Sequence, residues 1–198
     1  MKRESSVSSI LRRVLKKHKD DSLTYGELIA ALGEQAFGLI TILFALPSAL
    51  PVSVIPGISF VFGLPIVFIG LHLIAGRRSL WLPKKLSDYR VDVKKLDAVA
   101  RKTLPSILYI ERFLKPRLFF MSSPGMERVL GIVLLLLSFL LLLPIPFSNF
   151  FFASLIICFG LGLVEKDGLL LIIGYIGSFI YGFFLAWLGI GLWKVVTG

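Results

Sequence analysis

The stretch LPSALPVSVIPG, residues 46–57, places three prolines inside a 42-residue segment, Gln35–Gly76, that contains no Asp, Glu, Lys or Arg. Proline removes a backbone donor and breaks helices, and hydrocarbon contains no water to satisfy the freed carbonyl groups. At about 1.5 Å per helical residue, the segment is far longer than the roughly 30 Å of one membrane crossing. We therefore expect the prolines to divide it into the two arms of a broken helical hairpin.

Two further segments lack these charged residues, Val129–Val164 and Gly168–Trp193. All three exceed the ~18–20 residues that mark a membrane-spanning candidate, and they are apolar all round, unlike soluble helices. Val129–Val164 is too long for one crossing, so we expect a second hairpin there. Both hairpins are short spans or re-entrant elements, and the lengths leave this choice open. The last segment suits one long, tilted transmembrane helix.

The two hairpin segments share a pattern, which indicates an internal repeat. The motif Glu-x3-Gly-x12-Pro begins at Glu34 and again at Glu127, at an offset of 93 residues. The matched residues are Glu34 and Glu127, Gly38 and Gly131, and Pro51 and Pro144. Transporter folds often contain such repeats, with broken helices meeting near the membrane midplane.

The charge of the chain is strongly basic and unevenly distributed. Net charge is +10 over 198 residues. Residues 77–128 contain thirteen Lys/Arg against five acids, and residues 1–34 contain seven against five. Since both basic regions flank apolar segments, the positive-inside rule explains them better than nucleic-acid binding does. We therefore expect the N-terminus and the central region on the cytoplasmic side of the membrane, touching anionic lipid headgroups. The positive-inside rule also favours a parallel arrangement of the two repeats.

Amphipathic helices are expected outside the apolar segments. Residues 5–19 carry an apolar stripe beside basic residues, which is typical of a helix on the membrane surface. Thr24 and Glu27 have the spacing of a capping box and predict the start of a second helix. In the central region we expect two interfacial helices separated by Pro105. Trp81 suits an interfacial anchor.

The sequence thus predicts an all-α integral membrane protein. Its regions are a cytoplasmic amphipathic region (1–33), hairpin repeat 1 (34–76), a basic interfacial region (77–126), hairpin repeat 2 (127–167) and a C-terminal transmembrane helix (168–198). The glycines of the last helix would let a neighbouring helix approach closely. They are Gly174, Gly177, Gly182, Gly189 and Gly191. The sequence also leaves a homo-oligomer open.

Glu34 and Glu127 are the first candidates for a site. They either complement the helix dipole at headgroup level or face an inner cavity and bind a proton or cation. His72 is a candidate hydrogen-bonding or proton-relay residue. The remaining candidates for a solute or ion site lie at the two breaks: Pro51, Pro56, Gly57, Pro144, Pro146 and Asn149.

A second candidate set serves ion pairs or lipid headgroups. It comprises Arg77, Arg78, Trp81, Glu111, Arg112, Arg117, Glu165 and Asp167. Glu165 and Asp167 either belong to a solvated turn or pair with Arg77 or Arg78. Glu111, Arg112 and Arg117 either pair within the chain or hold lipid phosphate.

Enzyme signatures are missing from the sequence. We find no Gly-x-Ser-x-Gly, P-loop or HExxH motif. Cys158 is the only cysteine and neither histidine suggests a metal site. We therefore expect no metal, no cofactor and no catalytic residue.

Five stretches in this order resemble the ExoD family of bacterial exopolysaccharide-synthesis membrane proteins. They are LGEQAFGLITILFALPSALPVSVIPGISFVFGLP, GRRSLWLPKKL, ERFLKPRL, LPIPFSN and LGLVEKDG. The family usually has glutamine where this chain has His72, which puts in doubt a role that needs an amide there. Arginine is common at the position of Lys166, so the charge is kept. The resemblance implies a multi-pass protein of the bacterial cytoplasmic (inner) membrane that is linked to exopolysaccharide production, and it brings no catalytic residues.

Two functional hypotheses follow. In the first, the hairpins build a site that binds or transports a small solute, ion or lipid-linked intermediate. In the second, the protein is an accessory or scaffold protein whose basic central region docks polysaccharide-synthesis machinery or anionic lipid. A third hypothesis, modification of a lipid or sugar by membrane carboxylates, lacks a motif.

Overall fold

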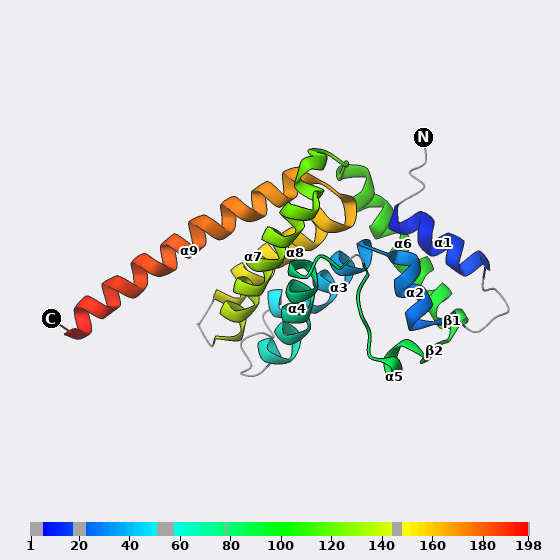
Figure 1. Cartoon of the computed structure of the whole chain (residues 1–198), viewed down its shortest axis with the longest axis horizontal. Helices are drawn as coiled ribbons and strands as arrows, with labels where there is room; N and C mark the ends of the chain where they lie inside the picture. Colours follow the sequence, from blue (N-terminus) through cyan, green and yellow to red (C-terminus); the bar gives the residue numbers. More distant parts are fainter. Residues whose placement is uncertain (1–5, 18–22, 51–57, 78, 144–147, 198) are drawn as a thin grey trace.

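The computed structural model describes residues 6–17, 23–50, 58–77, 79–143 and 148–197, and these residues are mostly helical (Figure 1). The helices are α1 (Val7–Lys17), α2 (Tyr25–Leu32), α3 (Gln35–Ala45), α4 (Ile58–Ile74), α5 (Lys84–Ser87), α6 (Val93–Phe113), α7 (Pro124–Leu142), α8 (Ser148–Glu165) and α9 (Gly168–Thr197), with short 3-10 turns η1 (Pro47–Ala49) and η3 (Phe119–Ser122). Two short strands, β1 (Leu23–Thr24) and β2 (Arg90–Val91), pair antiparallel.

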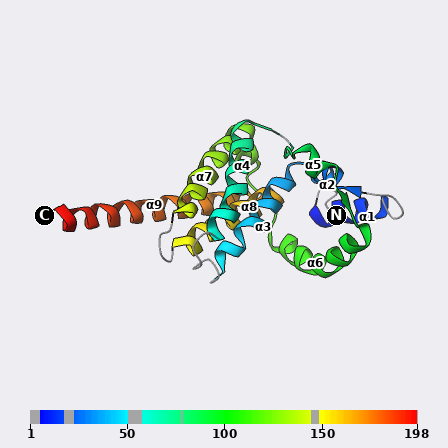
Figure 2. The same cartoon turned by 90° about the horizontal axis from the view of Figure 1, so that it is seen from below.

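The helices form three parts (Figures 1 and 2). Helices α3, α4, α7 and α8 pack into a bundle. Helices α1, α2, α5 and α6 and the two strands lie together at one end of the bundle, and we call them the cap. Helix α9 starts near the bundle and projects beyond it, on the side away from the cap.

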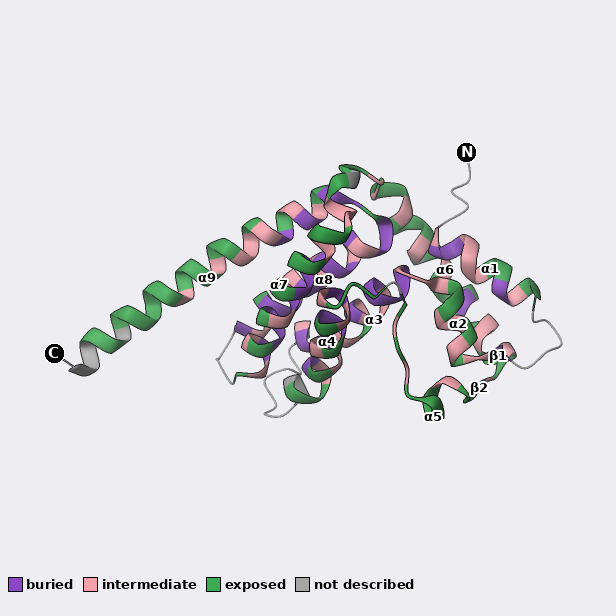
Figure 3. Cartoon of the chain, viewed as in Figure 1, coloured by how far each residue is buried: buried purple, intermediate pink, exposed green. Residues whose placement is uncertain are grey.

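The interior of the bundle is apolar. Ile66 and Ile69 of α4, Leu134 of α7 and Ile156 and Phe159 of α8 are at most 2% exposed. In Figure 3 the buried residues accordingly concentrate in the bundle, whereas α9 is exposed along most of its length. Buried hydroxyls in the bundle, such as those of Thr41 and Ser138, donate to the carbonyl four residues earlier in the same helix, so they need no partner across the interior.

Glycine pairs let the bundle helices approach at backbone distance. A Cβ added at Gly38 of α3 would lie 2.5 Å from the carbonyl oxygen of Gly160 of α8. A Cβ added at Gly131 of α7 would lie 2.8 Å from the carbonyl oxygen of Gly70 of α4. Membrane helices associate through such close contacts between small residues, because burial in lipid offers no hydrophobic gain.

All four bundle helices have one end beside the cap. Helices α3 and α7 begin there, and α4 and α8 end there. The chain enters the bundle through a sharp bend, because α2 and the α3–η1 segment are inclined by 113° to one another. The predicted capping box at the start of α2 is confirmed, since Thr24 and Glu27 each accept a hydrogen bond from the backbone N–H of the other.

Three helices among the described residues are long and apolar enough to cross a membrane: α7, α8 and residues Gly168–Gly191 of α9. The bent pair of α2 and α3 passes the same test only if taken together, and the apolar part of α4, Phe60–Ile74, is shorter. The expected fold class is thus confirmed: the described chain is mostly helical, and its long apolar helices, including the C-terminal one, could cross a membrane.

The glycines of α9 divide into two groups. Gly174 and Gly177 lie against Phe159 and Leu155 of α8, which confirms the expected close approach. A Cβ added at Gly182, Gly189 or Gly191 would meet nothing within 4 Å. The close packing of α9 on the bundle is therefore confined to its first half.

Two expectations for the amphipathic helices need correction. Pro105 does not separate two helices, because α6 continues through it from Val93 to Phe113. The predicted N-terminal helix is present as α1, but its stripe residues Val7 and Val14 are 1% and 7% exposed. Ile10, Leu11 and Leu15 of the stripe are half-buried, so the stripe packs in part within the protein and only the rest is available to a membrane surface.

The predicted proline turns lie outside the described residues. This concerns Pro51, Pro56, Gly57, Pro144 and Pro146, and Arg78 is also outside the described ranges.

The close crossing of α4 and α7 predicts a large effect of one added methyl group. Gly131→Ala would place its Cβ 2.8 Å from two backbone atoms, the Gly70 oxygen and the Ile74 nitrogen, and backbone cannot yield as a side chain can. We expect a loss of about 1–3 kcal/mol in stability, measured by thermal unfolding in detergent. Gly189→Ala is the matched control and should melt like the native protein. Equal melting of the two variants would contradict the crossing.

Candidate functional site

The four helix ends beside the cap surround a small polar pocket. Its volume is about 10 Å³, which is close to the least that can hold one water molecule. Its lining residues are Glu34, Phe37, Leu73, Arg77, Ser122, Glu127, Leu163 and Lys166. We call it the charged pocket, because two acids and two bases meet there.

An ion pair between distant parts of the chain closes one side of the charged pocket. Oε2 of Glu34 lies 2.9 Å from Nζ of Lys166, and the two side chains are 42% and 46% exposed. An ion pair with this exposure contributes less than about 1 kcal/mol to stability. The ion pair therefore matters mainly because it holds the start of α3 next to the turn after α8.

The backbone of Lys166 is unusual for a residue with a side chain. Its φ is 52°, in the left-handed region, directly after the last residue of α8. Gly76 adopts the same conformation after α4, with φ 66°. Glycine takes this conformation freely, whereas another residue pays roughly 1–2 kcal/mol. A strained lysine at a helix end favours a role for its charge.

The charges of the pocket follow the polarity of the helices. Glu34 precedes α3 and Glu127 lies in the first turn of α7, where the helix dipole favours negative charge. Arg77 and Lys166 follow the C-termini of α4 and α8, where it favours positive charge. The helix-end role expected for the two glutamates is thus compatible with a shared pocket.

The turn between α8 and α9 is anchored through Asp167, which is 3% exposed. Its Oδ1 accepts from the Leu169 N–H and its Oδ2 from the Lys115 N–H, both at 3.1 Å. The Gly168 N–H donates to the Arg117 carbonyl. The expectation of a solvated turn is wrong here, since Glu165 is also buried, at 7% exposure. Arg77 lines the charged pocket instead of contributing to this anchor.

Glu111 has a structural role within the cap. Its carboxylate accepts from the Ser8 N–H at 2.9 Å and from the Ser8 hydroxyl at 2.7 Å, which stabilises the start of α1. Arg112, Arg117 and Trp81 are exposed, so their predicted contact with lipid headgroups stays a prediction.

The remaining predicted site residues lie outside the charged pocket. His72 is on α4, and its Nδ1 lies 2.7 Å from the carbonyl oxygen of Phe68 one turn earlier. Asn149 lies in the first turn of α8, at the opposite end of the bundle. The structure therefore brings together Glu34, Glu127 and Arg77, and leaves His72 and Asn149 apart from them.

Three residues of this region were missed as site residues by the sequence reasoning. Lys166 and Ser122 line the pocket, and the guanidinium of Arg128 approaches Gly76, 3.4 Å from where a Cβ would be. The available signal was the preference for a basic residue at position 166 in the family. Within the described ranges, no three His, Cys, Asp or Glu residues are grouped to hold a metal ion.

Comparison with known proteins identifies relatives over most of the chain. The family model described as "Exopolysaccharide synthesis, ExoD" matches residues 7–187. Protein ExoD of Rhizobium meliloti is 34% identical over 176 residues, which are 87% of this chain and 72% of the relative. An uncharacterised protein of Synechocystis is 30% identical over 168 residues, 84% of this chain and 79% of the relative. No solved structure matches.

The left-handed backbone at Lys166 makes a prediction that separates strain from charge. Lys166→Ala loses the ion pair and keeps the strain, whereas Lys166→Gly loses the ion pair and relieves the strain. We expect the glycine variant to be more stable than the alanine variant by about 1 kcal/mol, measured by thermal unfolding in detergent. An alanine variant as stable as the glycine variant would contradict the left-handed conformation.

Proposed function

The chain belongs to the ExoD family, and we propose that it supports exopolysaccharide synthesis by binding a small ion, or the charged group of a solute or lipid-linked intermediate, in the charged pocket. In this proposal it is a non-enzymatic, multi-pass protein of the bacterial cytoplasmic membrane. One observation carries it: acids and bases from four helices meet at one point of an apolar bundle. Carboxylate, ammonium and guanidinium groups held at one point can form charge-assisted hydrogen bonds to a charged ligand.

The proposal includes an internal repeat of two hairpins, α3–α4 and α7–α8. The glycine crossings support it, because Gly38 and Gly131 are 93 residues apart and Gly70 and Gly160 are 90 residues apart. Buried positions match at the same offset of 90 residues, and each of these residues is at most 2% exposed. They are Ile66 with Ile156, and Ile69 with Phe159.

The packing of the two hairpins is reciprocal. The first arm of each hairpin packs against the second arm of the other, α3 on α8 and α4 on α7. This arrangement fits a pseudo-two-fold axis along the bundle, with the charged pocket on it. Two pairs of lining residues are then equivalent, Glu34 with Glu127 and Leu73 with Leu163. The bases are not equivalent, because Arg77 corresponds to Asp167 at the offset of 90 residues.

The bundle interior favours binding from one side over passage through the bundle. The described residues between the charged pocket and the opposite end are packed and apolar. A polar solute would have to separate helices that touch at glycine backbone. The pocket, by contrast, is reached from the capped end by displacing an ion pair that is almost half exposed. We therefore favour binding over transport.

The positive-inside rule assigns the capped end to the cytoplasm. The cap carries the exposed basic residues of α1, α5 and α6. If both hairpins cross and return, α9 starts on the cytoplasmic side and ends on the opposite side.

The proposal predicts that the paired carboxylates are needed for polymer output. In a strain that lacks the native gene, Glu34→Gln combined with Glu127→Gln should reduce exopolysaccharide at least about tenfold, as expected when charge-assisted contacts are lost. Polymer is quantified as total carbohydrate, and the variant is matched to the native protein for its amount in the membrane. Asp97→Asn is the control, because Asp97 pairs with Arg101 on α6, outside the pocket. Normal output from the double variant at normal protein levels would overturn the proposal.

The apolar interior predicts that reconstituted protein does not conduct. Proteoliposomes containing the native protein should release protons or small ions no faster than empty liposomes, measured with an entrapped pH-sensitive dye. A flux that requires Glu34 and Glu127 would replace binding by transport as the function of the pocket.

A further inference from the structure

The cap helix with an exposed face suited to a membrane surface is α6. Helix α1 is less suited, because its stripe residues Val7 and Val14 are buried, as is Ala100 of α6. Glu111 of α6 holds the start of α1 through Ser8. The apolar side of α1 is thus used in part within the cap, and an outward face of α6 stays exposed.

The exposed face of α6 changes character along the helix. Its first half carries Lys94, Lys95, Arg101 and Lys102, all exposed. Its second half carries Leu108, Tyr109 and Phe113, which are 42%, 65% and 62% exposed. The rings of Tyr109 and Phe113 are 4.8 Å apart and form one aromatic surface.

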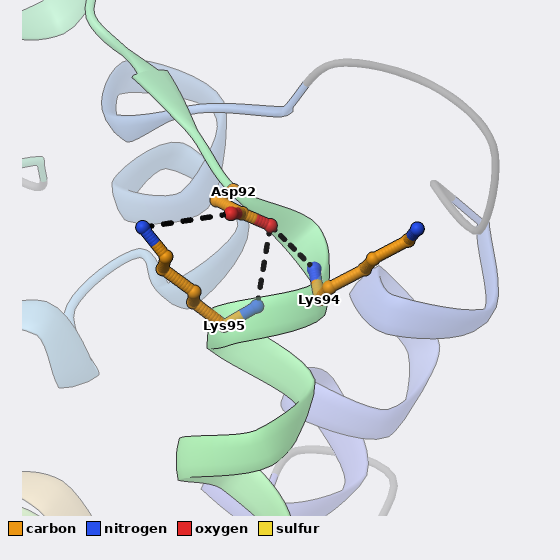
Figure 4. Close-up of polar contacts among 3 residues, drawn as sticks. All are labelled: Asp92, Lys94 and Lys95. Atoms are coloured by element: carbon orange, nitrogen blue, oxygen red, sulfur yellow. Dashed lines mark hydrogen bonds and ion pairs between the residues drawn. The ribbon is translucent and has the colours of Figure 1, made fainter.

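Several bases of this face are not neutralised within the protein. Asp92 caps the start of α6 by accepting from the N–H groups of Lys94 and Lys95, and its Oδ2 lies 3.8 Å from Nζ of Lys95 (Figure 4). Asp97 pairs with Arg101. Among the described residues, the side chains of Lys94, Lys102 and Arg112 have no acidic partner, so the face carries a net positive charge.

The aromatic end of α6 is fixed at the level of the charged pocket. The Lys115 N–H, just after α6, donates to Asp167 beside Lys166. From there Leu118 and Phe120, which are 43% and 59% exposed, lead along the chain to the start of α7. The aromatic half of α6 is thus the half that leads directly to a membrane-crossing helix, and the basic half lies earlier in the helix.

We infer that the outward face of α6 binds the anionic surface of the cytoplasmic leaflet, with Tyr109 and Phe113 inserted among the headgroups and Lys102 and Arg112 on lipid phosphates. The polar end of the Tyr109 ring suits the headgroup layer, and the apolar ring of Phe113 suits the boundary between headgroups and acyl chains. Lys or Arg beside them gain about 1 kcal/mol each from anionic lipid. The occupant is a lipid surface because the aromatic end of α6 is tied to the turn before the membrane-crossing helix α9 and the free charges are complementary to anionic headgroups.

The test uses a tryptophan reporter in the full-length protein. Trp81, Trp187 and Trp193 are replaced by Phe, and Phe113→Trp supplies the reporter at an exposed position. The protein is reconstituted in bilayers of one composition, phosphatidylcholine with phosphatidylglycerol, in which only one of the two lipids is brominated. Brominated phosphatidylglycerol should quench the reporter about two- to fivefold more than brominated phosphatidylcholine at the same mole fraction.

Charge reversal checks the source of this selectivity. Lys102→Glu with Arg112→Glu should abolish the preference for phosphatidylglycerol, whereas Lys16→Glu with Lys17→Glu on α1 should keep it. Equal quenching by both lipids would overturn the inference. Quenching by aqueous iodide without quenching by lipid would also overturn it, since the face would then lie in water. Protection from both quenchers would mean that a protein covers the face. A Tyr109→Trp reporter repeats the measurement should the first variant fold poorly.

Discussion

The close contact of helix backbones at two glycine crossings is the constraint on which the rest of the structure depends. In lipid, apolar side chains gain nothing by leaving their surroundings, so helices must associate through close van der Waals packing. Gly38 against Gly160 and Gly70 against Gly131 supply that packing. These contacts join α3 to α8 and α4 to α7, so the bundle needs helices from both halves of the chain.

The charged pocket is a consequence of this packing. When α3 lies on α8 and α4 on α7, two helix starts and two helix ends meet beside the cap. Each helix end carries the charge that its dipole favours, so acids and bases meet without any of them being placed in the apolar interior. The strained backbone of Lys166 indicates that a charge at this position matters more than an unstrained backbone conformation. Such a site suits recognition of a charged group from the capped side.

The sequence predicted those features that depend on local spacing or on the composition of long segments. The capping box of Thr24 and Glu27 and the apolar helices belong here. The meeting of Glu34 and Glu127 in one pocket was one of two alternatives that the sequence left open. Contacts between distant residues could not be predicted in this way. The glycine pattern marked Gly38 and Gly131, but their partners Gly160 and Gly70 depend on which helices cross.

Three predictions made from the local sequence were wrong. Proline usually interrupts a helix, yet α6 continues through Pro105. The stripe of α1 resembles a membrane-binding surface, but α6 covers part of it. Asp167 resembles a residue of a solvated turn, and it is buried because it caps α9 and binds the backbone after α6. For α1 and Asp167, a tertiary contact outweighs the local signal.

A cysteine cross-link can show whether the start of α3 meets the end of α8 at the charged pocket. Cys158, the only native cysteine, is replaced by Ser, and cysteines are introduced at Glu34 and Lys166, whose charged atoms are 2.9 Å apart. We expect a short bifunctional maleimide to cross-link this pair rapidly within one chain in native membranes. We expect no cross-link for the control pair at Glu34 and Asn149, at opposite ends of the bundle. Absence of the first product, with both single-cysteine proteins fully labelled, would contradict the account.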